Sequence, residues 1–69
     1  MKVGDKVIIR NLFSGHRVNG EVIKVEAHMF DVKTDSKNQM LKTMYFDSSM
    51  RGLARFSMWM IEGVKSDKK

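Results

Sequence analysis

Few of the residue types that perform catalysis are present, and those that occur are not grouped along the chain. His16 and His28 lie in segments expected to be loops, and a metal site would need a third ligand, such as Asp31 or Asp35, with a second shell to orient it. The serines lack a Gly-x-Ser-x-Gly elbow, and no Gly-x-x-x-x-Gly-Lys phosphate loop occurs. The chain has no cysteine, which excludes thiol nucleophiles, thiolate zinc sites and disulfides. We therefore expect a non-enzymatic protein with no bound metal or cofactor.

Basic side chains are the more informative group. The 69 residues include 13 Lys or Arg against 8 Asp or Glu, giving a formal net charge of +5. A small domain with this excess attracts polyanions, of which nucleic acid is the commonest. Combined with exposed aromatic rings, such cations could form a surface that stacks on bases and contacts phosphates. The predicted nucleic-acid-binding residues are Arg10, His16, Arg17, Lys24, Lys33, Arg51, Arg55, Phe13 and Tyr45.

Methionine is unusually frequent, with 7 in the chain, and most of these residues lie in its second half. Methionine fills irregular gaps in cores, and it is also over-used at adaptable protein-binding surfaces. The apolar run Met58, Trp59, Met60 and Ile61 does not alternate as a half-buried strand should. Either this strand is covered on both faces or one face is a contact surface, for a second copy or another protein. In the second case Met58, Trp59 and Met60 are the predicted protein-interaction residues, with Trp59 as the anchor.

Short β-branched segments separated by Gly, Asn, Asp and Ser predict several strands in the first half of the chain. The first strand covers residues 6–10, and residues 11–19 form a flexible loop. Gly20 opens the second strand, residues 21–26, in which Val22 and Val25 have opposite parity. Burying both valines requires a bulge or sharp bend. Residues 30–34 alternate cleanly and form the third strand.

The second half predicts two further strands and one helical turn. The fourth strand covers residues 39–46, and its parity is open because Met40, Met44 and Phe46 compete with Leu41 and Tyr45 for the core. Polar residues 47–49 resemble a helix N-cap ahead of residues 50–54. A glycine at position 52 weakens that helix, so one turn, of the 3₁₀ type, is expected. Residues 55–62 form the last strand.

This order of elements resembles the small SH3-like barrels of the Tudor and KOW kind. The likeness is carried by Val3-Gly4-Asp5-Lys6-Val7-Ile8-Ile9 and by Gly20-Glu21-Val22-Ile23-Lys24-Val25. In that superfamily a Gly-Asp turn leads into the first apolar strand, and a glycine precedes a bent second strand with a Val-x-x-Val spacing. The resemblance implies a closed five-stranded barrel whose second strand crosses both halves of the sheet. It covers residues 3–34; beyond them, only the order of elements agrees.

The predicted fold class is therefore all-β, a five-stranded SH3-like barrel with one short 3₁₀ turn before the last strand. Residues 1–63 form the single domain and residues 64–69 a flexible basic tail. The longest apolar run has only the four residues 58–61, and charged residues follow Met1 closely, so we expect a cytoplasmic protein with no membrane partner.

Two functions follow from these observations. The first is a nucleic-acid-binding module, for DNA or RNA, that contacts phosphates through its basic surface. The alternative is a protein-interaction module, an adaptor or inhibitor similar to the small basic accessory proteins with which bacteriophages redirect host machinery. The protein would be a monomer or a weak homodimer. Each candidate residue also has a plainer role: Phe13 could plug one end of the barrel, Tyr45 could be half-buried, and the charges could serve solubility.

Overall fold

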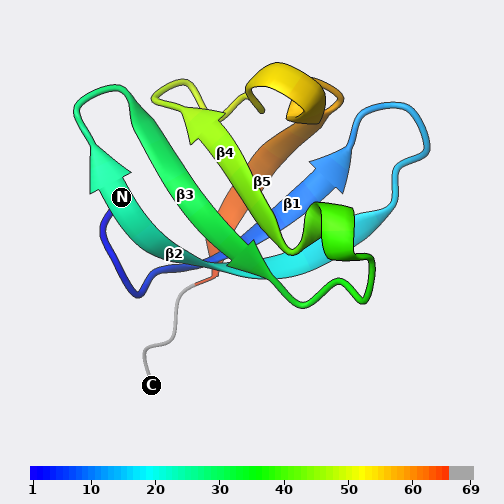
Figure 1. Cartoon of the computed structure of the whole chain (residues 1–69), viewed down its shortest axis with the longest axis horizontal. Helices are drawn as coiled ribbons and strands as arrows, with labels where there is room; N and C mark the ends of the chain where they lie inside the picture. Colours follow the sequence, from blue (N-terminus) through cyan, green and yellow to red (C-terminus); the bar gives the residue numbers. More distant parts are fainter. Residues whose placement is uncertain (66–69) are drawn as a thin grey trace.

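Five antiparallel strands form one curled sheet in the computed structural model, which describes residues 1–65 (Figure 1). The strands are β1 (Lys6–Asn11), β2 (Arg17–Glu26), β3 (Met29–Thr34), β4 (Thr43–Asp47) and β5 (Trp59–Lys65). Two single 3₁₀ turns, η1 (Gln39–Leu41) and η2 (Ala54–Phe56), precede β4 and β5. The order across the sheet is β4-β3-β2-β1-β5, so the first four strands form a meander and β5 returns to pair with β1. This confirms the predicted all-β class and its five strands.

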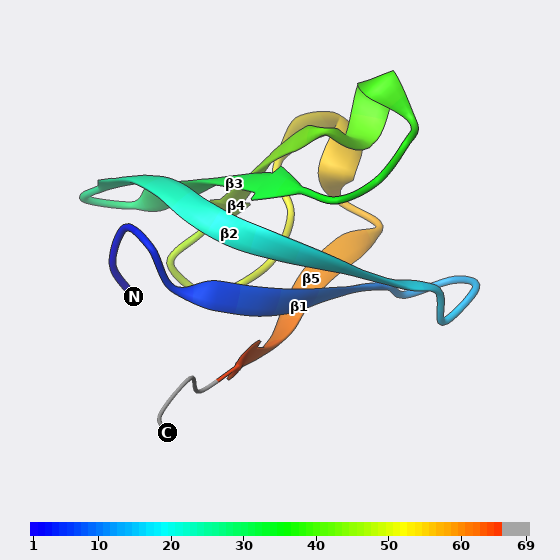
Figure 2. The same ribbon diagram turned by 90° about the horizontal axis from the view of Figure 1, so that it is seen from below.

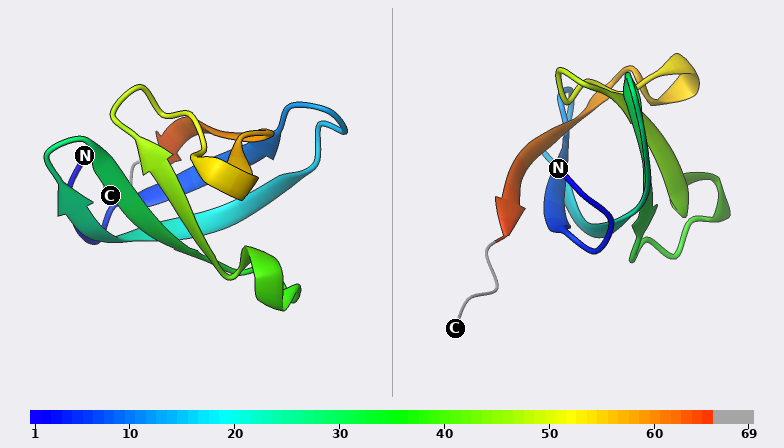
Figure 3. Two further views of the ribbon diagram at one scale, coloured as in Figure 1. Left: turned by 45° about the horizontal axis from the view of Figure 1, so that its top comes forward. Right: turned by 90° about the vertical axis from the view of Figure 1, so that its left-hand side faces the viewer.

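The sheet curls into a half-barrel that one segment closes at one end. Between β4 and β5, Gly52 forms a bridge with Phe46, and Arg51 forms one with Met60. The Ile61 amide donates to the Met50 carbonyl at 2.8 Å, which links the same segment to β5. Figure 3 shows the strands wrapped around a common interior when the molecule is turned. The result is a small all-β half-barrel compatible with an SH3-like fold.

The interior holds one core of apolar side chains. Inward and outward residues alternate along the strands, except at the irregularities in the pairing of β2 with β3 and of β1 with β5, because successive side chains of a strand face opposite sides of the sheet. Each buried side chain of this size stabilises the fold by about 1.5–3 kcal/mol relative to an exposed one. The buried hydrophobic residues are Val7, Ile9, Val18, Val22, Phe30, Val32, Met44, Phe46, Phe56, Trp59 and Ile61.

The bend predicted in the second strand is present. The register of β2 against β3 shifts between Val22 and Lys24, so Ile23 is the extra residue of a bulge. Val22 is completely buried, whereas Val25 remains 39% exposed near the end of the strand. The strand also begins earlier than expected, at Arg17 instead of Glu21, because residues 17–19 pair with β1. The predicted loop therefore shrinks to residues 12–16.

The pairing of β4 with β3 determines which side chains of β4 face the core. Phe46 lies opposite Phe30 and Met44 lies opposite Val32, so both are fully buried. Tyr45, between them, points to the outer face. The first part of the predicted strand forms η1 instead, where the Asn38 side chain accepts a hydrogen bond from the Met40 amide.

The helical turn and last strand lie further along the chain than predicted. The Asp47 carboxylate accepts from the amides of Ser49 and Arg51, which folds residues 47–51 into a tight turn in place of a helix N-cap. Met50 has φ of 75° and Ala54 of 53°, conformations that interrupt any helix over residues 50–54. The 3₁₀ turn consequently forms at Ala54–Phe56, and β5 begins at Trp59.

The last strand extends into the segment that was predicted to be a tail. Val64 and Lys65 continue β5, where they pair with Val7 and Lys6, and the remaining predicted tail residues, 66–69, lie outside the described part of the chain. No helix within residues 1–65 has both the length and the apolar character needed to cross a membrane.

Candidate nucleic-acid interface

The strand register places three of the predicted arginines in one line. Arg51 forms a bridge with Met60, Met60 pairs with Arg10 on β1, and Arg10 pairs with Arg17 on β2. Directly paired residues of antiparallel strands point to the same face of a sheet. Neighbouring strands lie about 4.8 Å apart, so this line spans about 14 Å of backbone. We call Arg51, Arg10 and Arg17 the arginine row.

The arginine row lies on the outer face of the half-barrel. In β1, Ile9 is fully buried, so its neighbour Arg10 points the opposite way. In β5, Trp59 and Ile61 are buried on either side of Met60, which therefore also faces outward. Met60, which is partly buried, thus lies between Arg51 and Arg10 in the strand register.

One carboxylate compensates part of this charge. The Arg17 Nε donates to Oε1 of Glu62 at 2.7 Å and its Nη2 donates to Oε2 at 3.1 Å, forming a bidentate ion pair. These hydrogen bonds lower the pKa of Glu62, and the charges of Arg17 and Arg10 lower it further, against a smaller opposing effect of desolvation. The same hydrogen bonds raise the pKa of Arg17. Because the pair is exposed, it contributes little to stability. It does hold the Arg17 guanidinium in one orientation beside Arg10, and the row keeps an excess of positive charge.

Arg10 is the most enclosed member of the row. Its Nε is buried and makes no hydrogen bond to any described residue. A buried donor without a partner costs free energy in the folded protein. An anionic acceptor that reached this guanidinium would offset that cost.

The other predicted cations do not join the row. Lys24 lies past the bulge and pairs with Glu26 at 3.1 Å, which raises the pKa of Lys24. Lys33 lies on the outer face of β3, opposite Glu21. The side chain of Arg55 lies over the Phe56 ring at 5.6 Å, in the 3₁₀ turn η2, and Arg55 is not paired with any member of the row. His16 is exposed and directly precedes Arg17, so it lies at the edge of the row.

The aromatic residues divide into one exposed ring and several packed rings. Phe13 is 87% exposed in the loop between β1 and β2, and so it does not plug the barrel. Tyr45 is 38% exposed and packs edge-to-face on Phe56 at 5.7 Å, as a half-buried residue does. Trp59, the predicted anchor for a protein contact, is only 8% exposed and belongs to the core.

Three exposed apolar residues, Leu12, Phe13 and Met58, lie next to the arginine row along the chain and are called here the apolar cluster. The Leu12 amide donates to the Met58 carbonyl at 2.7 Å, and both side chains are more than a third exposed. Phe13 follows Leu12 in the same loop. Of the three residues predicted for protein contact, Met58 is therefore the one that reaches solvent most.

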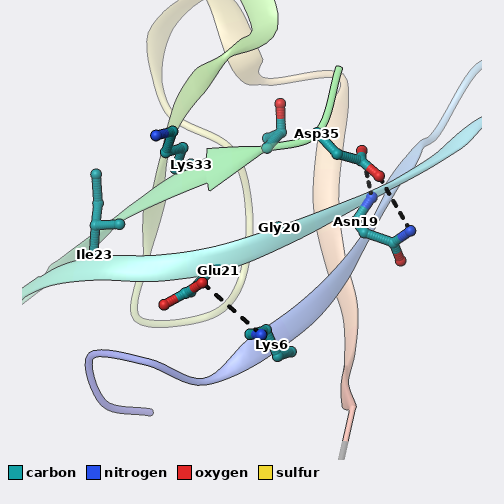
Figure 4. A pocket seen from close by; sticks show the side chains of 8 residues that line it. Lys6, Asn19, Gly20, Glu21, Ile23, Lys33 and Asp35 are labelled. Carbon is teal, nitrogen blue, oxygen red and sulfur yellow. Dashed lines mark hydrogen bonds and ion pairs between the residues drawn. The ribbon is translucent and has the colours of Figure 1, made fainter. Parts of the chain in front are cut away.

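A separate open hollow lies on the outer face of β1, β2 and β3 (Figure 4). It has a volume of about 490 Å³ and is lined by Lys6, Asn19, Gly20, Glu21, Ile23, Lys33, Thr34 and Asp35. Lys6 lies 4.0 Å from Glu21, and Asn19 donates to Asp35 through its amide and its side chain. Its two cations face two carboxylates, so the hollow has no net charge and is a poor site for an anion.

The two histidines lie at opposite ends of β2, His16 before it and His28 in the turn that follows. Ten strand residues separate them, about 30 Å at the usual rise of a strand. Among the described residues, no group of three or more His, Cys, Asp or Glu side chains is placed to hold a metal ion.

Two residues of the candidate site were not predicted in their observed roles, because those roles depend on how distant strands pair. Glu62 was not expected to face Arg17, since the two are 45 positions apart. Met60 was considered as a protein contact and not as the residue between two arginines. Both follow only from the register of β5 on β1, which the sequence pattern does not specify. Comparison with known protein families, with curated proteins and with solved structures finds no match for this chain.

Proposed function

We propose that this protein is a small non-enzymatic module that binds nucleic acid by contacting phosphates with the arginine row. The observation that carries the proposal is the alignment of Arg51, Arg10 and Arg17 on one face. Their three guanidinium groups outnumber the two nearby carboxylates, Glu62 beside Arg17 and Asp47 beside Arg51. Guanidinium groups match phosphate oxygens in a bidentate geometry, which makes arginine well suited to this contact. The overall excess of positive charge would steer a polyanion toward this face.

The architecture is consistent with this proposal. A half-barrel compatible with the SH3-like fold, together with the Gly-Asp turn before β1 and the bulged β2, supports a relationship to the Tudor and KOW barrels. Fold-level likeness does not identify a ligand, so the function rests on the arginine row and not on the barrel.

The test is fluorescence anisotropy with labelled DNA and RNA oligomers between about 50 and about 200 mM salt. Affinity should fall linearly with salt on logarithmic axes. The double variant Arg17→Gln/Arg51→Gln should lose two phosphate contacts and therefore reduce the slope by about 1.4–1.8.

The matched control is Lys24→Gln/Lys37→Gln, which lowers the formal net charge by the same two units, to +3, at exposed positions away from the row. This control variant should retain most of the wild-type slope of affinity against salt concentration. An equal loss of slope in both double variants would show that binding depends on the overall charge and not on the arginine row. Absence of binding at the lower salt concentration would contradict the proposal.

The exposed apolar cluster favours a second candidate, the protein-interaction module. Leu12, Phe13 and Met58 would then contact the partner, with Trp59 supporting them from the core. In that case the arginine substitutions should slow association without abolishing it, because peripheral charges mainly affect the rate of encounter.

A further inference from the structure

Phe13 is the only one of the four phenylalanines that lies outside the core. Its side chain is 87% exposed, whereas Phe30, Phe46 and Phe56 are 8% exposed or less. A large ring at a loop tip adds nothing to the core of the folded domain and leaves an apolar surface exposed to solvent. The ring is therefore available to contact a ligand outside the chain.

The loop that carries Phe13 is ordered without help from the ring. The Asn11 side-chain oxygen accepts from the amides of Phe13 and Ser14 at 2.9 and 3.0 Å. The Asn11 amide donates to the His16 carbonyl at 2.8 Å, and the Gly15 amide donates to the Asn11 carbonyl at 2.9 Å. Gly15 adopts φ of 78°, which a glycine accepts without strain. The loop is thus a defined turn that presents the ring to solvent.

This loop also rises directly from the arginine row. Arg10 and Arg17 are the last pair of β1 with β2, and residues 11–16 connect them. The bond from the Leu12 amide to the Met58 carbonyl ties the loop to the start of β5. Figure 2 shows the β1–β2 hairpin extending beyond the rest of the molecule. The ring and two guanidinium groups therefore share one hairpin.

We propose that Phe13 stacks on an unpaired base of a single-stranded nucleic acid whose neighbouring phosphates contact Arg10 and Arg17. This inference rests on the proposed function and adds the class of ligand. Every base has a face on which an aromatic ring can stack, so the contact tolerates any sequence. In a duplex those faces are covered by neighbouring base pairs, and the ring can reach them only at the ends. Single strands should accordingly bind more tightly than duplexes of the same length.

The experiment compares Phe13→Ala, Phe13→Leu and Phe13→Tyr with the wild type, using an unstructured single-stranded oligomer and a duplex of equal length. Phe13→Ala and Phe13→Leu should bind the single strand about 5- to 100-fold more weakly, the range expected for one lost stack. Phe13→Tyr should stay close to the wild type, since it keeps a ring. Duplex affinity should change by less than about twofold. All variants should unfold at the wild-type temperature because the ring lies outside the core.

A second readout uses Phe13→Trp. The native Trp59 is buried and should report no contact, whereas a tryptophan at the loop tip should lose fluorescence when a base stacks on it. Quenching by the single strand and not by the duplex would support the inference.

The outcomes separate this inference from the proposed function. If the arginine variants weaken salt-dependent binding but all Phe13 variants bind the single strand as the wild type does, stacking is overturned and phosphate binding stands. Equal weakening of single strand and duplex by Phe13→Ala also overturns stacking. If no oligomer binds the wild type, both proposals fail, and the exposed ring then points to an apolar protein surface as its partner.

Discussion

Asp47 shows how one side chain sets the path of the chain between β4 and β5. Its Oδ1 accepts from the Ser49 hydroxyl at 2.7 Å and from the amides of Ser49 and Arg51 at 2.9 and 3.1 Å. These hydrogen bonds, led by the one from the Ser49 hydroxyl, lower the pKa of Asp47. The ionised carboxylate is therefore the form that stabilises the turn, and this turn places Arg51 in the arginine row.

The stability of the protein should depend on pH through this residue. Because the pKa of Asp47 is lower in the folded than in the unfolded chain, its contribution is complete above the usual aspartate value of about 3.9 and is lost as the pH falls toward the folded pKa. Asp47→Asn should therefore lower the melting temperature at pH 7. The difference from wild type should narrow as thermal unfolding is followed down to about pH 3.

Asp47→Ala separates the charge from the hydrogen bonds, since an asparagine oxygen can still accept and an alanine cannot. Its melting temperature should lie below that of Asp47→Asn at neutral pH. A constant difference in melting temperature between Asp47→Asn and wild type from pH 7 to pH 3 would contradict a stabilising role of the ionised carboxylate.

At the scale of elements, residues 50–52 form the segment that closes the half-barrel, here called the closing segment. Its contact with η2 depends on the absence of a side chain at Gly52. A Cβ at this position would lie 1.7 Å from the Phe56 carbonyl oxygen and 2.9 Å from that of Trp59. Both obstacles are backbone atoms, so no side chain can move aside. The Gly52 amide donates to the Trp59 carbonyl at 2.8 Å, and the bridge to Phe46 lies on the other side.

We expect Gly52→Ala to destabilise the fold by about 3 kcal/mol or more, because the closing segment must separate from η2 or β5. Gly63→Ala is the matched control, since a Cβ there meets nothing within 4 Å, and it should change stability by less than about 0.5 kcal/mol. Urea unfolding of both variants measures the difference. Equal stability of the two would show that the segment does not close the half-barrel in solution.

The same elements show how far sequence reasoning reaches. Strands with strict alternation, such as residues 30–34, were located well, and the opposed parity of Val22 and Val25 predicted the bulge that is observed. The segment of residues 47–58 was misplaced because its path is determined by the Asp47 turn, two residues with positive φ and the close approach at Gly52. Periodicity carries no information about such contacts.

The sequence nominated the three arginines of the row among nine candidate residues, but it did not indicate which of the nine lie together. Arg10, Arg17 and Arg51 were among the predicted phosphate contacts, and Phe13 was among the predicted rings. Their grouping depends on the register between β1 and β5, which only the folded chain defines. The sequence left open whether Trp59 anchors a contact or belongs to the core, because an unbroken apolar run does not reveal which of its residues faces inward; the residue lies in the core.

For the molecule as a whole, a single core predicts that it unfolds in one step. Trp59 is the one tryptophan in the chain and is 8% exposed within that core, so its fluorescence reports on the packing directly. Urea unfolding followed by this fluorescence and by far-ultraviolet circular dichroism should give coincident curves, with a free energy of unfolding of about 3–10 kcal/mol and a slope near 1 kcal/mol/M. A fluorescence change that precedes loss of the strands would show that β5 detaches from the meander first.

The pairing of β1 with β5 has a consequence for how the protein is made. Ile9 finds its partner Ile61 only after some fifty further residues have been synthesised, whereas β2, β3 and β4 each follow their partner closely. A nascent chain on the ribosome can therefore assemble the meander while one edge of β1 is still unpaired. During that interval the apolar edge of β1 is open to other strands, and the growing chain would be vulnerable to aggregation and a substrate for chaperones.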